Sequence, residues 1–281
     1  MTRPAAPPAR GRFALPDVAP RALARVARLD AVLLYRNRTA LFTVFGLPLL
    51  FVGMLAPMRG QDVDGVDGAL LQGTGHLAFF LIFVVFMNLV TVFTTRREDL
   101  TLKRLRGTAL SDADVLGGSV LTAVAVYAVQ AVFLLVVLGT VFDGRFPADP
   151  LLLVAGLAAG AAIFALLALT VSGLTPNAEL AQLTVLPIMF GCMLGGGVMF
   201  PLDTLPDAVH AACRLLPLTP VVEITRTAYF GQDFAGASEH AALGLAGGWA
   251  ACAQSFAVLA AWLVLGREAA KRRFRWEPRR G

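Results

Sequence analysis

Charged residues are scarce in this sequence, and they are absent from long parts of it. Only 15% of its 281 residues are charged and 57% are hydrophobic, whereas soluble domains carry about 25% charged residues. Six stretches of at least 19 residues contain no Asp, Glu, Lys, Arg or His: 39–58, 77–95, 115–141, 151–174, 180–200 and 241–266. A helix of about 20 residues crosses the hydrocarbon core of a bilayer. The sequence therefore predicts an all-α integral membrane protein with six transmembrane helices.

The lack of charge inside these stretches also limits the source of energy for any transport. Proteins that use ion or proton gradients usually keep an ionisable residue at membrane depth. None of the six stretches has one, which disfavours a secondary transporter. If the chain moves a substrate, we expect the energy to come from another subunit.

Motifs for catalysis and nucleotide binding are missing as well. The sequence has two lysines, Lys103 and Lys271, and neither follows a glycine, so it has no GxxxxGK[ST] phosphate loop. None of the three histidines has HExxH spacing, and the three cysteines form no CxxC pair. We therefore expect a chain that is not an enzyme, with no catalytic residue, no metal site and no cofactor. Any ATP would be bound by a partner subunit.

The basic residues are distributed unevenly between the predicted spans. Of the 24 Lys and Arg residues, 20 fall in the alternate segments 1–38, 96–114, 175–179 and 267–281. Basic residues are retained on the cytoplasmic side of a membrane. The pattern predicts a multi-pass protein of the plasma membrane with both termini in the cytoplasm. It also favours anionic lipid over nucleic acid as the contact of the basic surface.

The regions at the two ends of the chain differ from the apolar middle. Residues 1–19 are rich in proline and have no apolar run, which predicts a disordered cytoplasmic tail. Over 20–36, arginines share one helical face and leucines the opposite one, which is typical of an amphipathic helix lying on the inner leaflet. The alternative is a helix packed on protein. We expect one transmembrane domain over 20–266 and a basic cytoplasmic tail over 267–281.

Few polar side chains fall within the predicted spans. We consider four of them as residues of a substrate path: Asn88, Gln130, Gln182 and Gln254. Hydrogen bonding between helices is the commoner role of such residues. A path with so little polar lining favours a bulky, amphiphilic cargo over a small ion.

Two segments outside the spans have distinctive patterns. In the cytoplasmic segment 96–114, Leu102 and Leu105 lie among charged residues, Gly107 can end a helix and Ser111 can begin another. This pattern predicts a short charged helix suited to docking a soluble partner. The alternative is a solvated loop whose arginines only maintain the topology.

The outer segment 200–231 is too apolar for an ordinary exposed loop. We predict two short helices, 207–216 and 221–230, separated by the prolines of 217–220. Each has about half of the ~20 residues that a span requires, so we expect both to be re-entrant. Glu223 and Arg226 lie at i, i+3 and could pair.

These two segments resemble motifs of the permease subunits of type-two ABC exporters, in the daunorubicin-resistance-like and polysaccharide-export-like group. Those permeases carry a stretch like ERExGTLERLxxTPxS, and residues 96–111 are similar to it. They also carry a stretch like GxxFPLDxLPxxLxxxxxxLPLTxxVxxxR, which residues 197–226 resemble more specifically. The chain departs from the family pattern at Leu100, Ala109 and Gly118.

The resemblance implies residue roles. It implies a coupling helix that contacts an ATPase subunit, with these residues: Arg97, Glu98, Thr101, Leu102, Leu105, Arg106, Thr108 and Ser111. It also implies an outer gate formed by the re-entrant helices, with these residues: Phe200, Pro201, Asp203, Pro206, Pro217, Thr219, Glu223 and Arg226.

The same resemblance implies an assembly and an activity. Two permeases, either identical copies or paralogues, would face two ATPase copies and export an amphiphilic substrate such as a drug, an antibiotic, a lipid or a glycan. Two other classes stay open, a secondary transporter and a membrane scaffold or assembly factor that moves nothing.

Overall fold

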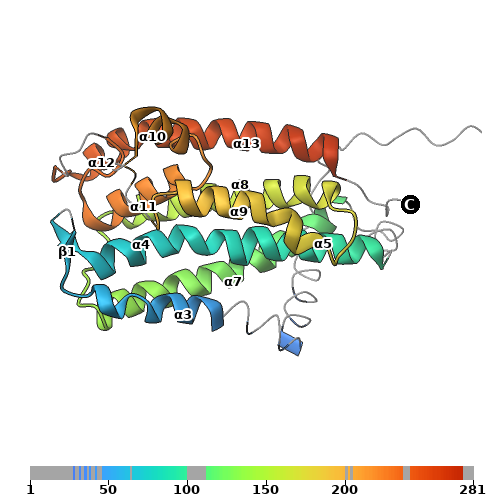
Figure 1. Cartoon of the computed structure of the whole chain (residues 1–281), viewed down its shortest axis with the longest axis horizontal. Coiled ribbons are helices and arrows are strands. Elements are labelled where there is room, and N and C mark those ends of the chain that lie inside the picture. The colour runs from blue at the N-terminus through green and yellow to red at the C-terminus, as the bar shows by residue number, and fades with distance from the viewer. Residues whose placement is uncertain are drawn as a thin grey trace, which may run out of the picture.

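The computed structural model describes residues 46–63, 65–99, 112–199, 205–236 and 241–274, and the single residues Arg28, Val32, Tyr35, Arg36, Arg38, Phe42 and Leu202. The described residues form an elongated bundle whose long helices run side by side along its longest axis (Figure 1). The predicted disordered tail, nearly all of the predicted amphipathic helix, and residues 100–111 of the predicted coupling helix lie outside the described residues.

One continuous helix of 31 residues, Gly68–Glu98, runs through the bundle. It consists of α4 (Gly68–Phe80), the π-helical segment η3 (Leu81–Met87) and α5 (Asn88–Glu98). It begins earlier than the predicted span 77–95 because the Asp67 carboxylate accepts hydrogen bonds from the Ala69 and Leu70 amides and so caps its first turn.

Two further helices are long and apolar enough for the predicted spans 115–141 and 151–174. They are α7 (Asp112–Thr140) and α8 (Pro150–Leu174). Asp149 caps α8, and Pro150 occupies the first turn, where its missing N–H costs nothing. In the apolar window of the Gly68–Glu98 helix 72% of the residues are buried, against 28% for α7, so the first helix is central and α7 is peripheral.

The last predicted span is bent. Helices α12 (Leu245–Ala251) and α13 (Ala253–Arg273) meet at an angle of 52° and together are long and apolar enough to cross a membrane. Helix α13 continues seven residues into the predicted tail, to Arg273. The basic residues of its last turn suit the negative end of the helix dipole, and Lys271 pairs with Glu268 one turn before it.

Six spans stay a prediction, because the described residues contain three helices that could cross a membrane, or four with the bent pair. The predicted span 180–200 contains only α9 (Ala181–Gly195), which ends at a run of glycines where Gly197 adopts a φ of +69°. The predicted span 39–58 is only partly described, and its described part includes the short apolar helix Leu49–Met58.

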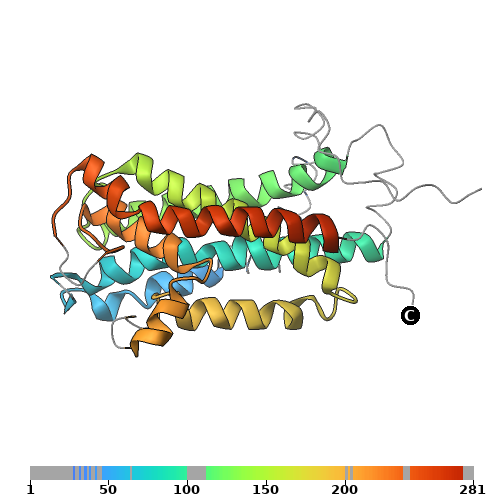
Figure 2. The same ribbon diagram turned by 90° about the horizontal axis from the view of Figure 1, so that it is seen from above.

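Short elements gather at one end of the bundle. They include α3 (Leu47–Gly53), η2 (Ala56–Met58) and an antiparallel hairpin of β1 (Asp62–Val63) and β2 (Val66–Asp67). Helices α10 (Asp207–Cys213) and α11 (Thr219–Phe230) follow α9. Figure 2 shows α9 along one edge of the bundle, leading to α10 at this same end.

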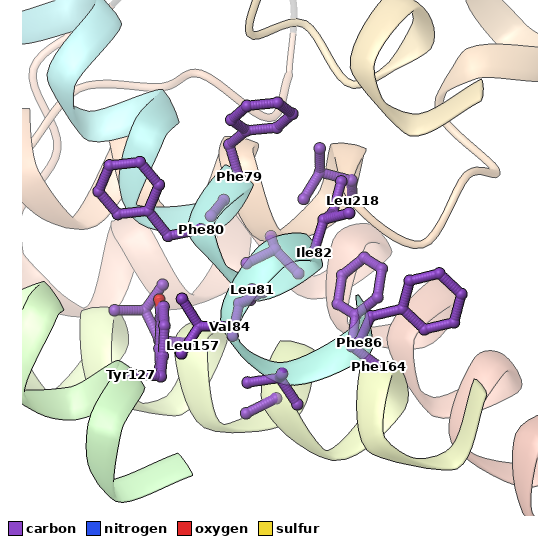
Figure 3. Packing of buried hydrophobic residues seen from close by; sticks show 14 of the residues in the cluster. Phe79, Phe80, Leu81, Ile82, Val84, Phe86, Tyr127, Leu157, Phe164 and Leu218 are labelled. Atoms are coloured by element: carbon purple, nitrogen blue, oxygen red, sulfur yellow. The ribbon is translucent and has the colours of Figure 1, made fainter. Parts of the chain in front are cut away.

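The core is centred on the π-helical segment. Figure 3 shows Phe79, Phe80 and Phe86 around η3, with Phe164 of α8 facing Phe86, and the Phe86 and Phe164 ring centroids are 6.1 Å apart. The Tyr127 hydroxyl of α7 donates to the Leu77 carbonyl, 2.7 Å away, just before η3 begins. A π-helical turn changes the backbone pairing of a helix, and Tyr127 satisfies a buried carbonyl at that point.

The bundle therefore has two ends of different make-up. We call the first the hairpin end, formed by β1, β2, α10, α11 and α12 (Figure 1). We call the other the α5 end, formed by the last turns of α5, α8 and α13 and the start of α9. The side chains of Phe93 and Phe274 meet there, with ring centroids 6.1 Å apart.

Candidate functional site

A cleft opens at the hairpin end, beside α4 and α11. Its volume is about 200 Å³. Apolar side chains form much of its wall, among them Met58, Leu71, Val198 and Val222. Three charged residues, Arg214, Glu223 and Arg226, face the same space. The cleft is thus amphipathic.

Glu223 of α11 is the centre of a polar network in the wall of this cleft. It accepts a hydrogen bond of 2.5 Å from the Ser255 hydroxyl of α13 and pairs with the Arg214 guanidinium at 3.2 Å. Arg214 follows α10 and also donates to the carbonyl of Ala235. Burial raises the pKa of the Glu223 carboxyl above its ordinary value, and Ser255 and Arg214 oppose that rise. The network joins α10, α11 and α13.

The predicted pair of Glu223 with Arg226 is wrong. Glu223 pairs with Arg214 instead, and Arg226 donates to the Gly197 carbonyl at 2.9 Å. The positive φ of Gly197 turns the chain after α9 beside α11 and provides this acceptor. Arg226 therefore links α11 to the segment that follows α9.

A second cavity, of about 180 Å³, lies on the other side of the network. Its lining includes Gln254, Ser255 and Val258 from α13. Both cavities are lined by His210, Arg214 and Glu223. The Arg214–Glu223 ion pair, which we call the partition pair, thus stands between them.

The four predicted path residues are not brought together. Gln254 lines the second cavity, whereas Gln130 is buried inside the bundle, Asn88 is half-buried and Gln182 is exposed on α9. Among the four, only Gln254 lines either of the two cavities.

The predicted outer-gate residues are described in part. Phe200, Pro201 and Asp203 lie outside the described residues, and Pro206 precedes α10 as its N-cap. Pro217 lies in the turn between the two short helices. The buried Thr219 hydroxyl contacts the Gly195 carbonyl at 3.0 Å and the Cys213 carbonyl at 2.6 Å.

The two short helices exist, with bounds that differ from the prediction. Helix α10 ends three residues before the predicted 216, and α11 starts two residues before the predicted 221. Pro220 lies inside the first turn of α11 and does not break it, because a helix leaves its first amides unpaired and tolerates proline there.

The α5 end contains a buried arginine. Arg97 is 2% exposed, and its guanidinium donates to the Ser172 and Thr175 carbonyls, at 2.6 and 2.5 Å. These carbonyls belong to the C-terminus of α8, where the last carbonyls of a helix have no partner within it. A cation there is also favoured by the helix dipole. We call this contact the arginine clamp.

The residues on either side of Arg97 contact other elements. The Ala178 amide, in the loop between α8 and α9, donates to the Glu98 carboxylate at 2.9 Å. Arg96 donates to the Ser119 hydroxyl of α7 at 2.7 Å. The end of α5 is therefore tied to α7, to α8 and to the start of α9.

These contacts bear on the predicted coupling residues. Arg97 and Glu98 were expected at a contact with a soluble partner, but the Arg97 side chain points into the bundle. The other six predicted coupling residues, Thr101, Leu102, Leu105, Arg106, Thr108 and Ser111, lie outside the described residues.

Sequence reasoning missed several residues of both sites. Arg214 and Ser255 complete the network around Glu223, and Ser172 and Thr175 supply the acceptors of the clamp. An arginine within an apolar outer segment is a usable signal for Arg214. Backbone carbonyls have no such signal, because every residue has one.

The side chains of the described residues offer little to a metal ion. Among them, no group of three or more His, Cys, Asp or Glu is close enough to hold one. The arrangement instead consists of two cavities at one end of a helical bundle and a buried cation at the other end.

Comparison with known proteins identifies the family. No curated protein matches this chain. The sequence model of the family described as ABC-2 family transporter protein matches residues 65–266, which include the partition pair, the arginine clamp and the lining of the cleft except Met58 and Val63. The chain therefore belongs to the ABC-2 family of membrane transport proteins.

Proposed function

We propose that this chain is the permease subunit of an ATP-driven exporter in the plasma membrane, with ATP hydrolysed by a separate subunit. The ABC-2 family match supports a transport subunit of the membrane. The absence of a phosphate loop from the sequence supports a separate ATPase. The observation that carries the proposal is the amphipathic cleft at the end of the bundle opposite the segment that would meet that ATPase.

The lining of the cleft supports an amphiphilic substrate. An apolar group would contact side chains such as Leu71, Val198 and Val222, and a polar group would face Arg214, Glu223 and Arg226. Ligand sites commonly combine a largely apolar wall with a few placed polar groups. A drug, an antibiotic, a lipid or a glycan-like amphiphile fits this description.

The α5 end would be the cytoplasmic end. Arg96, Arg97 and the basic last turn of α13 lie there, and basic residues favour the cytoplasmic side. Residues 100–111, between α5 and α7, would form the coupling segment that contacts the ATPase. Two permeases and two ATPases would make the complete exporter, with both termini of this chain in the cytoplasm.

The hairpin end would then hold the outer gate. Helices α10 and α11 have 7 and 12 residues, too few for a span of about 20 residues. They would dip into the outer leaflet, and the partition pair would hold them closed against α13 through Ser255. Opening this pair would join the two cavities.

Two alternatives make different predictions. A secondary transporter would work without an ATPase, and a membrane scaffold would need no path for a substrate. The cleft favours a transporter over a scaffold, and the uncharged spans favour an ATP-driven system over a secondary transporter.

Purification distinguishes these classes. The full chain, extracted from its native membrane in mild detergent, should bring down an ATPase with a phosphate loop, and the isolated chain should show only background ATP hydrolysis. The complex in proteoliposomes should move a fluorescent amphiphile only with ATP. Movement of the probe by the isolated chain along an ion gradient would instead support the secondary transporter.

A further inference from the structure

Helix α8 contacts the arginine clamp at one end of the bundle and α11, the helix that carries Glu223, toward the other end. It has 25 residues, so it is about 38 Å long at 1.5 Å per residue. It packs more extensively on α13 than any other two of the described elements pack together, and its next most extensive contact is with α11. Helix α11 carries Glu223, so α8 reaches from the arginine clamp to the helix of the partition pair.

At the α5 end, α8 is held from two sides. Arg97 binds its last carbonyls. A Cβ atom at Gly173 would lie 2.0 Å from the Arg273 carbonyl oxygen, so the backbones of α8 and α13 are in direct contact. The contact is backbone to backbone, and no flexible side chain lies between them to absorb a shift.

Toward the hairpin end, α8 meets α11 through two more glycines. A Cβ at Gly156 would lie 2.5 Å from the Ile224 side chain, and a Cβ at Gly160 would lie 3.0 Å from that of Val221. Ile224 and Val221 are both fully buried. They flank Glu223 in the sequence of α11, so a shift of α8 along its axis presses on the turn that carries the partition pair.

We propose that α8 is a rigid rod that transmits movement from the coupling segment to the partition pair, with Arg97 as the positioning residue that fixes the rod to α5. Residues 100–111 follow α5 in the sequence after Asp99, and in this proposal a displacement of that segment reaches Arg97. The two hydrogen bonds from the Arg97 guanidinium to backbone carbonyls then pass it to the end of α8. Close-packed interiors transmit such displacements because they hold few voids. This inference rests on the proposed function.

The test measures at the hairpin end an effect of substitutions made at the α5 end. Val222 lines the cleft and is 2% exposed, so Val222→Cys, in a chain whose three native cysteines are replaced by alanine, reports how often the cleft opens. We call this introduced thiol the reporter thiol. Its rate of labelling by a membrane-impermeant maleimide is measured on the full chain in membranes. Arg97→Met removes the clamp, and Arg97→Lys keeps the charge but not the two-pronged geometry.

Arg96→Met is the matched control, because it removes the same charge one residue earlier, at a side chain that donates to Ser119 of α7. Arg97→Met loses both charged hydrogen bonds of the clamp, so we expect labelling of the reporter thiol to rise at least about tenfold, the factor that loss of one of them alone would give, and to rise less in Arg97→Lys. Arg96→Met should label like the parent.

Equal labelling rates in all the variants would overturn the proposal that α8 transmits movement. A rise in Arg96→Met equal to that in Arg97→Met would also overturn it. If Arg97→Met does not accumulate in membranes, Arg97→Lys decides: a rate equal to that of the parent overturns the proposal, and a raised rate supports it. Adding the ATPase and ATP separates the two levels of inference. If ATP fails to change labelling in the parent while Arg97→Lys still raises it, the result supports the role of α8 and contradicts the proposed ATP-driven function.

Discussion

At each end of the bundle an arginine holds helices together, but the acceptors of the two arginines differ. Arg97 binds backbone carbonyls at the α5 end, and Arg214 binds the Glu223 carboxylate at the hairpin end. A carbonyl has no proton to gain and no rotamer to change, whereas a carboxylate can be protonated or turn away. The difference suggests a permanent joint at one end and a releasable one at the other.

Burial follows the same division. Arg97 is 2% exposed, whereas the side chains of Arg214 and Glu223 are 24% and 12% exposed and border two cavities. A group beside a cavity has room to move and solvent to receive it. The clamp has neither, so its loss should destabilise the chain as well as open the cleft, whereas loss of the partition pair should open the cleft with little loss of stability.

The largest effect is expected from removal of the clamp. Arg97→Met leaves the Ser172 and Thr175 carbonyls buried without these donors, and two hydrogen bonds to a charged group correspond to about 3 kcal/mol. We expect the free energy of unfolding in detergent to fall by about that amount, and Arg96→Met to lower it by about 1.5 kcal/mol, because it loses one such hydrogen bond, to Ser119. Equal losses would mean that the clamp stabilises the α5 end no more than the single contact of Arg96 with Ser119 does.

The next effect concerns the contact of α8 with α13. In Gly173→Ala the new methyl group meets the Arg273 backbone, which cannot rotate away. Overpacking of this kind costs about 1–3 kcal/mol. Gly191→Ala in α9 is the control, because a Cβ there has nothing within 4 Å, and replacing a helical glycine should stabilise by about 0.5–1 kcal/mol. Thermal unfolding of both variants measures the difference, and a harmless Gly173→Ala would contradict a tight joint.

How much of this could be predicted depends on where each signal lies. Long apolar runs predicted the helices around 77–95, 115–141 and 151–174, because spanning a membrane depends on composition and length alone. The run 180–200 stays a prediction as a span, since α9 has 15 residues and ends at Gly195, where the run of glycines begins. Glu223 was identified, but its partner was sought one turn away on the same helix, and the turn at Pro217 brings Arg214 beside it instead.

The arginine clamp shows a different limit of sequence reasoning. Arg97 stands in a charged run next to the coupling segment, and charge in a sequence suggests a surface position. Its acceptors are carbonyls 75 and 78 residues further along the chain. Only the packing of α5 on the end of α8 brings them together, and no residue type marks that contact in advance.

A smaller effect is expected when the partition pair is broken. Glu223→Gln removes the charge and keeps the shape, so we expect labelling of the reporter thiol to rise about threefold to tenfold, which corresponds to about 1 kcal/mol. Arg59→Gln is the control, since it breaks the exposed Arg59–Asp143 pair at the same end of the bundle. In the charge swap, Arg214→Glu combined with Glu223→Arg, a labelling rate that returns to that of the parent would show that the ion pair itself keeps the cleft closed. Unchanged labelling in Glu223→Gln would remove the gate role of the pair.

The smallest effect, and the finest test of the comparison, is a dependence on pH at the hairpin end alone. Burial raises the pKa of Glu223 from its ordinary value of 4.5, with Asp233 adding to the rise. The carboxylate form, which holds Arg214, is therefore present above the raised pKa and is lost as the pH falls through it, earlier than for an exposed glutamate. The Arg97 clamp has no titrating acceptor and should not respond.

Thiol reactivity itself changes with pH, so the useful quantity is the ratio of reporter-thiol labelling rates in Glu223→Gln and in the parent. Glutamine cannot titrate, and the maleimide reaction has the same intrinsic pH dependence in both proteins. We expect the ratio to be largest at pH values above the raised pKa of Glu223 and to approach one over the range in which the pH falls through that pKa, because protonation makes the parent resemble the variant. A ratio that stays constant over this range would show that Glu223 does not change its charge there, and the hairpin end would then be as permanent as the clamp.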